Sequence, residues 1–222
     1  MLHIQARTPV SNLPIKRVMS KLFQSFIYSH LPQKEHQGYA HPNGKVFKSS
    51  VFQIHYDRNT ISIDFRSLEK EYEQDLAMAI LKHGLKLGEV HLSETTVQLT
   101  QESDPDSVMN AQGFVCAAIK NDLTKKKIFL EPGDYRHTQI ITTNALQKYE
   151  ALFGEPYEGD LRITPLWQSF KPHTFWYEKT PYTAWKARYK IEATPKMLRL
   201  IRDTGLGSGT MKNLGFLELT DG

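Results

Sequence analysis

The stretch that decides the fold of this chain lies near its end and reads Gly205-Leu206-Gly207-Ser208-Gly209-Thr210-Met211-Lys212-Asn213-Leu214-Gly215-Phe216-Leu217. We call residues 205–217 the glycine-rich segment, since they hold four of the 13 glycines. Before it, Thr194-Pro195 predicts the start of a helix over 195–204, because proline is favoured in the first helical turn. The apolar residues between Leu214 and Leu219 predict a final strand. The predicted order is therefore helix, glycine-rich segment, strand.

This order excludes two common phosphate-binding motifs. A Walker A loop or a dinucleotide fingerprint needs a strand, then glycines, then a helix, because phosphate binds at the helix N-terminus. Here the glycines follow the C-terminus of a helix, and their spacing matches neither motif. A backbone with little side-chain bulk still lets N–H groups approach a phosphate closely. The segment therefore predicts a contact to a nucleic-acid backbone, with an ordinary flexible connection as the alternative.

Length and composition set further bounds. A chain of 222 residues suits one large or two small domains, and 40% hydrophobic residues are enough for their cores. No apolar run is long enough for a transmembrane helix, and no secretory signal is visible. The single cysteine, Cys116, excludes an internal disulfide and is expected to be a buried thiol. These features predict a soluble, cytoplasmic protein.

The distribution of charge points to a partner. The whole chain has a net charge of only +4, but residues 162–212 hold ten Lys/Arg and three Asp/Glu. All three tryptophans lie in the same stretch. Basic residues interleaved with aromatic ones suit a polyanion whose bases can stack, so they favour nucleic-acid binding. A solvated basic surface over an aromatic core is the alternative.

The first half of the chain reads as one α+β unit. Alternating apolar residues predict strands over 2–8, 52–56 and 61–65, and one or two more within 85–99. Residues 14–30 and 68–83 have the spacing of amphipathic helices, and 32–45 form a polar loop. The order is β-α-β-β-α-β, which is a ferredoxin-like unit.

The second half repeats this order. The polar stretch 101–111 marks a boundary, so we predict domains over 1–106 and 107–222. Strands are predicted over 114–119, 127–131, 135–142, 160–170 and 182–192, with helices over 144–153 and 195–204. Apart from extra hairpin strands, this is again β-α-β-β-α-β. The predicted fold class is α+β, with two tandem ferredoxin-like (RRM-like) βαββαβ domains.

Three stretches carry a resemblance to a known family: Phe26-Ile27-Tyr28, His41-Pro42-Asn43-Gly44-Lys45-Val46-Phe47-Lys48-Ser49-Ser50, and the glycine-rich segment. With the tandem ferredoxin-like units, they resemble the RAMP superfamily of CRISPR RNA-binding proteins. Within it, the chain is most similar to the endoribonucleases that cut CRISPR repeat RNA. The resemblance implies cleavage without metal or other cofactor, by attack of a 2′-OH, leaving a 2′,3′-cyclic phosphate and a 5′-OH.

Such cleavage needs a base, an acid and a group that stabilises charge on the phosphate. Histidine transfers protons near neutral pH, lysine stabilises phosphate charge, and tyrosine can orient or donate. The resemblance places these roles on Tyr28, His41 and Lys45. The glycine-rich segment and the basic stretch 162–212 predict RNA contacts by four glycines and three basic residues: Gly205, Gly207, Gly209, Gly215, Lys212, Arg199 and Arg202. The expected partner is CRISPR repeat RNA, and binding to other CRISPR effector subunits is also compatible with the resemblance. The protein itself is expected to be a monomer or homodimer that does not bind a membrane.

Alternatives remain at each level. His30 and His36 compete with His41, Tyr39 with Tyr28, and Lys48 with Lys45. The three histidines also raise a zinc site, which the lack of paired cysteines and of regular helical spacing disfavours. A non-cleaving RNA-binding subunit of a CRISPR effector complex is the main functional alternative. A generic RNA-recognition module ranks last, because no basic-Gly-aromatic signature lies on a predicted strand.

Overall fold

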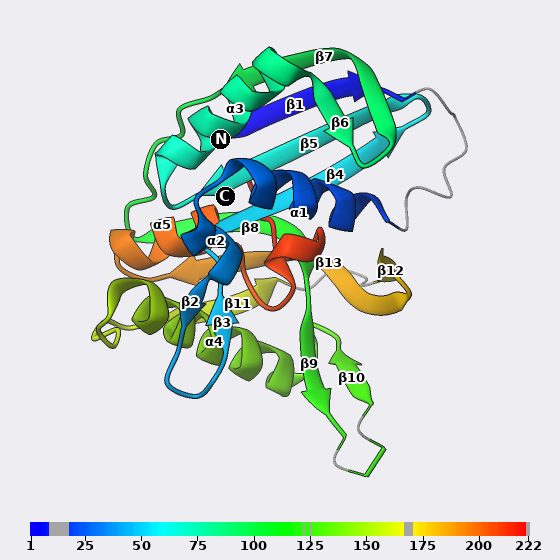
Figure 1. Ribbon diagram of the computed structural model, residues 1–222. Coiled ribbons are helices and arrows are strands. Elements are labelled where there is room, and N and C mark those ends of the chain that lie inside the picture. The colour runs from blue at the N-terminus through cyan, green and yellow to red at the C-terminus, as the bar shows by residue number, and fades with distance from the viewer. Residues whose placement is uncertain (9–17, 122, 125, 167–170, 221–222) are drawn as a thin grey trace.

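The computed structural model describes residues 1–8, 18–121, 123–124, 126–166 and 171–220. Two five-stranded antiparallel sheets form its frame, and the longer helices pack on them (Figure 1). Two short ribbons, β2–β3 and β9–β10, extend beyond the sheets.

The first sheet is built from residues 2–99. Its spatial order is β4 (Ser50–Asp57), β5 (Thr60–Ser67), β1 (Leu2–Arg7), β7 (Val90–Leu99) and β6 (Leu85–Leu87). Helices α1 (Met19–His30) and α3 (Lys70–His83) cover one face, because alternate strand residues and the inner helix stripes are both apolar. Phe23 of α1 meets Phe52 of β4 edge to face, with ring centroids 5.0 Å apart.

The connection from α1 to β4 is more ordered than the predicted polar loop over 32–45. It contains α2 (Gln33–Gln37) and the ribbon of β2 (Tyr39–Ala40) and β3 (Val46–Phe47). Gly38 ends α2 with a φ of +80°, and a Cβ there would lie 2.5 Å from the carbonyl oxygen of Phe47. A glycine at this position therefore lets the ribbon fold back against α2.

The second sheet has the spatial order β11 (Arg162–Leu166), β13 (Thr180–Glu192), β8 (Val108–Val115) and β14 (Glu218–Leu219), and β12 (Pro172–Tyr177) also pairs with β13. Its core is covered by α4 (Tyr135–Phe153) and α5 (Pro195–Thr204). Between β8 and α4, the strands β9 (Ala117–Lys120) and β10 (Lys127–Leu130) form a hairpin that projects from the body (Figure 1). A 3₁₀ turn, η2 (Thr210–Lys212), lies within the glycine-rich segment.

Both sheets share one topology. Each contains four strands from a β-α-β-β-α-β run, and in each the second, third, first and fourth of these strands are neighbours in that order. This is the ferredoxin-like arrangement, so the predicted fold class of two tandem ferredoxin-like units is confirmed. The boundary between residues 106 and 107 stays a prediction.

The structure corrects the prediction of a strand over 135–142. These residues form the first half of α4, which begins at Tyr135 rather than near residue 144. The carboxylate of Asp134 caps the helix by accepting a hydrogen bond from the backbone N–H of Arg136 at 2.9 Å. Inside, buried residues recur every four positions at His137, Ile141 and Ala145. The threonines and isoleucines of this turn favoured a strand locally, and tertiary packing overrode that preference.

Three further differences are smaller. The predicted final strand is only β14, because the backbone before it loops through the glycine-rich segment. The predicted helix over 14–30 is described from Met19 onward, and its residues 14–17 lie outside the described residues. Residues 167–170 of the predicted strand over 160–170 also lie outside them.

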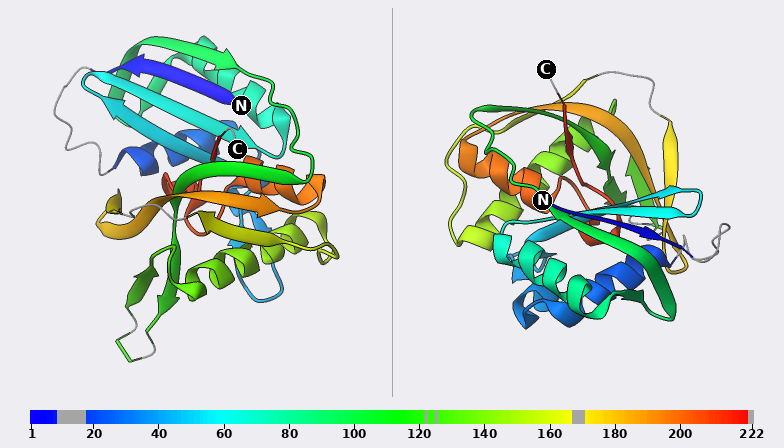
Figure 2. Two further views of the ribbon diagram at one scale, coloured as in Figure 1. Left: turned by 180° about the vertical axis from the view of Figure 1, so that it is seen from behind. Right: turned by 90° about the horizontal axis from the view of Figure 1, so that it is seen from above.

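The glycine-rich segment joins the two units. Figure 2 (left) shows one sheet above the other, with the end of the chain between them. Met211 of the segment is buried in the core of the first unit, and Asn213 Oδ1 accepts a hydrogen bond from the backbone N–H of Ile54 on β4 at 2.6 Å. Across the described ranges, none of the helices has the length and hydropathy needed to cross a membrane.

Candidate functional site

A cavity of about 470 Å³ lies where α1, β3, the β9–β10 hairpin, α4 and the glycine-rich segment meet. We call it the basic cavity. Its described lining residues include no aspartate and no glutamate but five lysines: Lys45, Lys48, Lys127, Lys148 and Lys212. Five cations without a lining carboxylate create a positive potential, which attracts a polyanion.

Tyr28, predicted as a catalytic residue, lines this cavity from the last turn of α1. Its ring stacks on that of His36, with centroids 4.7 Å apart and planes tilted by 27°. Lys48 Nζ lies 5.1 Å from the centre of the tyrosine ring. We call these three side chains the tyrosine cluster. Burial, and then the nearby Glu35 carboxylate, raises the pKa of Tyr28 well above its usual range, so its hydroxyl stays protonated.

Backbone contacts fix the other two members of the cluster. Lys48 Nζ donates hydrogen bonds to the carbonyl oxygens of Glu35 at 2.9 Å and His36 at 2.5 Å. Burial lowers the pKa of Lys48. The side chain of Glu35 is fully buried, and its Oε2 accepts hydrogen bonds from Ser49 N at 3.1 Å and Ser49 Oγ at 2.6 Å. Glu35 thus connects α2 to the residue that precedes β4. His36 lies on the exposed side of α2.

His41 and Lys45 contact the second unit instead. His41 Nε2 lies 3.1 Å from Glu150 Oε2 on α4, and His41 Nδ1 accepts a hydrogen bond from Asn43 N at 3.2 Å. The side chain of His41 is only 10% exposed. Lys45 Nζ donates a hydrogen bond to Gln147 Oε1 at 2.8 Å and lines the basic cavity. The structure therefore brings Lys45 and Tyr28 to one cavity, whereas both ring nitrogens of His41 already have partners.

The glycine-rich segment divides into two parts. Gly207, Gly209 and Lys212 line the basic cavity. Gly205 and Gly215 are buried and do not line it, and a Cβ on Gly215 would lie 2.4 Å from the carbonyl oxygen of Leu206. A glycine at position 215 therefore allows the segment to fold against itself. Because Gly205 and Gly215 are buried away from the cavity, they lack the exposure that their predicted RNA contacts require.

Lys212 is held by aromatic side chains at the edge of the cavity. Its Nζ donates a hydrogen bond to Tyr182 Oη at 2.7 Å. The same nitrogen lies 4.6 Å from the centre of the Tyr182 ring and 4.7 Å from that of Tyr177. These contacts orient the ammonium without neutralising its charge, so it remains available for a phosphate.

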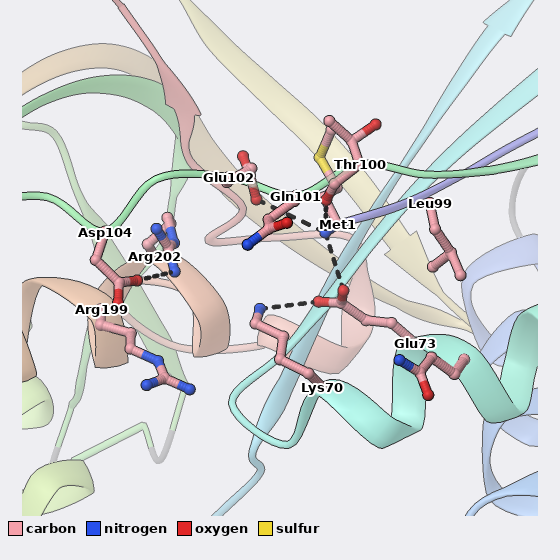
Figure 3. A pocket seen from close by; sticks show the side chains of 11 residues that line it. Met1, Lys70, Glu73, Leu99, Thr100, Gln101, Glu102, Asp104, Arg199 and Arg202 are labelled. Carbon is pink, nitrogen blue, oxygen red and sulfur yellow. Dashed lines mark hydrogen bonds and ion pairs between the residues drawn. The ribbon is translucent and has the colours of Figure 1, made fainter.

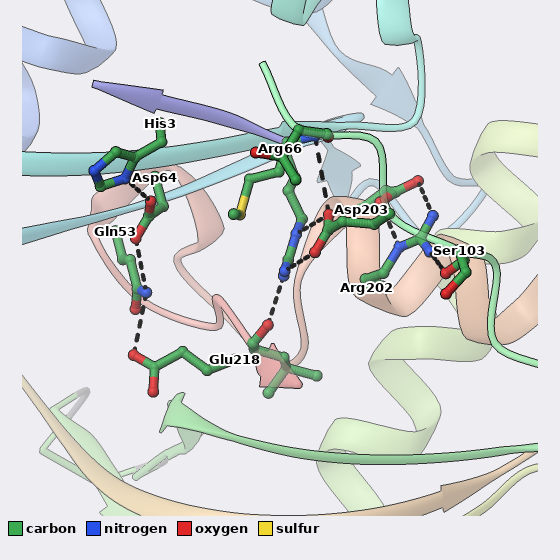
Figure 4. Close-up of polar contacts among 12 residues, drawn as sticks. His3, Gln53, Asp64, Arg66, Ser103, Arg202, Asp203 and Glu218 are labelled. Atoms are coloured by element: carbon green, nitrogen blue, oxygen red, sulfur yellow. Dashed lines mark hydrogen bonds and ion pairs between the residues drawn. The ribbon is translucent and has the colours of Figure 1, made fainter. Parts of the chain in front are cut away.

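Arg202 lies elsewhere, and its burial corrects its predicted role. The side chain is 1% exposed, and its guanidinium donates hydrogen bonds to Asp203, Asp104 and the carbonyl oxygen of Ser103 (Figure 4). Four of its five N–H donors are therefore used within the protein and its charge faces two carboxylates, which disfavours binding of an RNA phosphate there. Arg199 is 42% exposed but lines a second cavity, shown in Figure 3, and its predicted RNA contact stays a prediction.

The second cavity belongs to what we call the polar seam, a set of ion-paired groups between the units. Arg66 of β5 donates hydrogen bonds to Glu102 at 2.8 and 2.5 Å and to the carbonyl oxygen of Leu217 at 2.5 Å (Figure 4). Lys70 Nζ lies 3.1 Å from Asp203 Oδ2. The cations of the seam face carboxylates. Its members are Arg66, Lys70, Glu73, Glu102, Asp104, Arg202 and Asp203.

No metal site emerges from the described ranges, where no three His, Cys, Asp or Glu side chains are arranged to hold an ion. His30 is hydrogen-bonded to its own helix through the carbonyl oxygen of Phe26 at 2.9 Å, so it does not join His36 at Tyr28.

Sequence reasoning missed three residues of the cavity. Lys127 of β10 is absent from the predicted site residues, but it lines the cavity and its Nζ lies 5.1 Å from the centre of the Tyr182 ring. Asn144 and Lys148 of α4 were not considered. Their spacing of four residues on the predicted helix over 144–153 was the available signal, but nothing in the sequence says that this face of the helix lines a cavity.

Comparison with known proteins identifies a family. The sequence model of the family described as "CRISPR associated protein Cas6, C-terminal" matches residues 99–219, which is more than half of the chain. No match is found among curated proteins.

Solved structures share the fold over the full length. The structure titled "An RAMP protein binding different RNA substrates" superposes with a TM-score of 0.74 at 15% identity, covering 99% of each chain. The one titled "Characterization of a Cas6-related gene from Pyrococcus furiosus" gives 0.73 at 14% identity, covering 99% of this chain and 98% of that one. A Cas6 product complex gives 0.69 at 14% identity with the same coverage.

Proposed function

The chain belongs to the CRISPR-associated protein Cas6 family, and on that premise we propose that it is an endoribonuclease that cleaves CRISPR repeat RNA. The observation that carries the proposal is the tyrosine cluster at the basic cavity. A phosphate bound by the cavity's lysines would lie beside Tyr28, whose ring stacks on that of His36, and these are residue types that proton transfer needs. Solved structures with the same fold include Cas6 product complexes, which supports RNA as the substrate.

The proposed reaction needs no metal. A base removes the proton of a 2′-OH, the oxygen attacks the adjacent phosphorus, and the bond to the 5′ oxygen breaks as an acid protonates that oxygen. The products are a 2′,3′-cyclic phosphate and a 5′-OH. His36 and Tyr28 are the proton-transfer pair, and the ammonium of Lys48 stabilises the charge that develops on the phosphate.

This assignment replaces His41 with His36 as the proposed proton-transfer histidine and Lys45 with Lys48 as the charge stabiliser. The stacking of His36 on Tyr28 supports it, as does the pairing of both His41 nitrogens. His41, together with Lys45, then holds the β2–β3 ribbon against α4. The earlier assignment remains the alternative, and one pair of variants separates the two.

The test uses His36→Ala and His41→Ala with the repeat RNA transcribed from the CRISPR array of the same genome. His36→Ala should bind RNA nearly as well as wild type, while its single-turnover rate falls by about 10²- to 10⁴-fold, the usual contribution of a positioned acid or base. His41→Ala should be much milder. The opposite result would assign proton transfer to His41 and exclude His36 from that role.

Two controls test the chemistry itself. Cleavage should proceed in EDTA, and strict dependence on added Mg²⁺ or Zn²⁺ would contradict the mechanism. A substrate with 2′-deoxy at the nucleotide before the cut should bind and resist cleavage, because its nucleophile is missing. Normal cleavage of that substrate would exclude 2′-OH attack.

A second candidate is a non-cleaving RNA-binding subunit of a CRISPR effector complex. The structural relative described as "binding different RNA substrates" favours it, since that title names binding and not cleavage. The same assay decides: tight binding of repeat RNA by wild type, with no cleavage over hours, would support the subunit and contradict the enzyme.

A further inference from the structure

Helix α4 presents a stripe of side chains to the basic cavity that the proposed reaction does not use. Ile140, Asn144 and Lys148 line the cavity at a spacing of four residues, so they share one face of the helix. Ile140 is apolar, whereas the other two bring a side-chain amide and an ammonium into the cavity wall.

Lys148 is almost completely buried, with 3% of its surface exposed, although it lines the cavity. Its Nζ donates hydrogen bonds to the carbonyl oxygens of Thr204 at 3.0 Å and Gly205 at 2.6 Å. These carbonyls lie where α5 ends and the glycine-rich segment begins, so the ammonium fixes the path of the segment into the cavity. An ammonium has three N–H donors, and these two bonds leave one for a ligand.

Asn144 lies one helical turn before Lys148. Its Oδ1 is buried and has no hydrogen-bond partner within the part of the chain that the structure describes. A buried acceptor without a partner is unfavourable, because it has lost its hydrogen bonds to water. A donor group on a molecule in the cavity would remove that cost.

We propose that Asn144 and Lys148 form a subsite for one nucleotide of the RNA. Lys148 binds a phosphate of that nucleotide while it holds the glycine-rich segment, and Asn144 Oδ1 accepts a hydrogen bond from a hydroxyl or amino group of the same nucleotide. The subsite rests on the proposed function, because that function makes RNA the ligand of the basic cavity.

The subsite has a signature that a purely structural lysine lacks. Burial lowers the pKa of Lys148 to about 7, close enough to neutral pH for the neutral form to be populated there. A bound phosphate favours the charged form, so RNA binding at neutral pH takes up a fraction of a proton at this residue. The other titratable groups that line the cavity are Tyr28, Lys45, Lys48, Lys127, Tyr182 and Lys212.

Calorimetry with an uncleavable repeat RNA, 2′-deoxy at the mapped cut, measures this uptake. At pH 7, the binding enthalpies in phosphate and Tris buffers differ by the number of protons taken up multiplied by the difference between the ionisation enthalpies of the two buffers. Lys148→Arg keeps a charged donor but does not titrate, so it should bind RNA and take up fewer protons than wild type. Lys148→Met should lower the slope of log affinity against log salt by about 1. Asn144→Ala should weaken binding roughly tenfold without changing the slope.

Lys82→Met is the matched control, because Lys82 is an exposed lysine on α3 outside the cavity. It should change neither proton uptake nor slope. Proton uptake by Lys148→Arg equal to that of wild type would overturn the subsite, since the proton would then go to another group such as Lys48. That result would leave RNA binding intact, whereas wild type that binds no repeat RNA would overturn the subsite and the proposed function together.

Discussion

The basic cavity and the polar seam both lie where the two units meet, and both are rich in lysine or arginine. In the seam, Arg66 and Arg202 face Glu102, Asp104 and Asp203 at hydrogen-bonding distance. In the cavity, no carboxylate is found among the lining residues that the structure describes. Basic side chains are thus paired with carboxylates in the seam, whereas the described lining of the cavity leaves its lysines without acidic partners and available to an anionic ligand.

The energetics of the two regions differ accordingly. Removing one member of a buried pair leaves an uncompensated charge, which costs about 3–5 kcal/mol, so the seam mainly affects stability. Removing Lys212 from the cavity relieves repulsion among like charges and should cost little stability, because its ammonium contacts aromatic side chains and no carboxylate in the described lining. Variants in the two regions should therefore move different measurements, and four predictions follow from the largest effect to the smallest.

The glycine-rich segment reaches both regions, and Gly215 lies where it folds against itself. Gly215→Ala should lower the free energy of unfolding by roughly 4 kcal/mol, since a Cβ would combine left-handed strain with a backbone clash. Urea titration measures the loss. Gly209→Ala is the control, because its φ of +83° is similar but its nearest contact is a leucine methyl at 3.2 Å. Equal losses in both variants would show that the clash contributes nothing.

Arg202→Met tests the seam. The variant should lose about 3 kcal/mol of stability, because Asp203 is fully buried and would lose its bidentate partner. The salt dependence of RNA binding should not change. Arg199→Met, at a partly exposed position one turn earlier, should cost less than about 1 kcal/mol. If the Arg202→Met protein is stable and its RNA affinity depends less steeply on salt concentration, Arg202 contacts RNA after all.

His137 adds a buried group outside both regions, on the helix that walls the cavity. Burial lowers its pKa from 6.5 to about 4 in the folded protein. The folded state therefore favours the neutral ring: its contribution to stability is complete above pH 6.5 and is lost as the pH falls towards 4, by about 3 kcal/mol. Urea midpoints between pH 7 and 4.5 measure this loss. His137→Phe should reduce the dependence in that window, and an unchanged profile would assign it to other groups.

Lys212→Met tests the cavity and should have the smallest effect. Loss of one phosphate contact should lower the salt slope of RNA binding by about 1 and change stability by less than about 1 kcal/mol. The aromatic contacts of Lys212 are the reason to expect a small effect on stability. Lys82→Met again serves as the control. A large loss of stability with an unchanged slope would place Lys212 in a structural role like that of Arg202.

Features that depend on neighbours in sequence were predictable. The helix α5 follows from Thr194-Pro195, because the cap lies next to the helix that it starts, and the Thr194 hydroxyl does accept from Met197 N. The hairpin turn between β4 and β5 follows from the polar residues at Asp57–Thr60 for the same reason. The repeated β-α-β-β-α-β order was sufficient for the fold class.

Features that depend on distant residues were not predictable. Nothing near His36 or His41 says which one meets Tyr28, since the position of α2 is set by Glu35 binding Ser49, which lies 14 residues further along the chain. The burial of Arg202 depends on Asp104, which is 98 residues away. Lys148 lies on the predicted helix over 144–153, but its place in the cavity depends on the carbonyl groups of Thr204 and Gly205, which are 56 and 57 residues away.

The path of Met211 has a consequence for how the protein is made. This methionine is buried in the core formed by residues 2–99, and the next residue but one, Asn213, pairs with the backbone of β4. During translation, the last strand of the first sheet is synthesised more than a hundred residues before that side chain exists. Until then the core of the first unit lacks one apolar side chain, and the backbone of β4 lacks one hydrogen-bond partner. The first unit therefore completes its packing only after the glycine-rich segment has been synthesised.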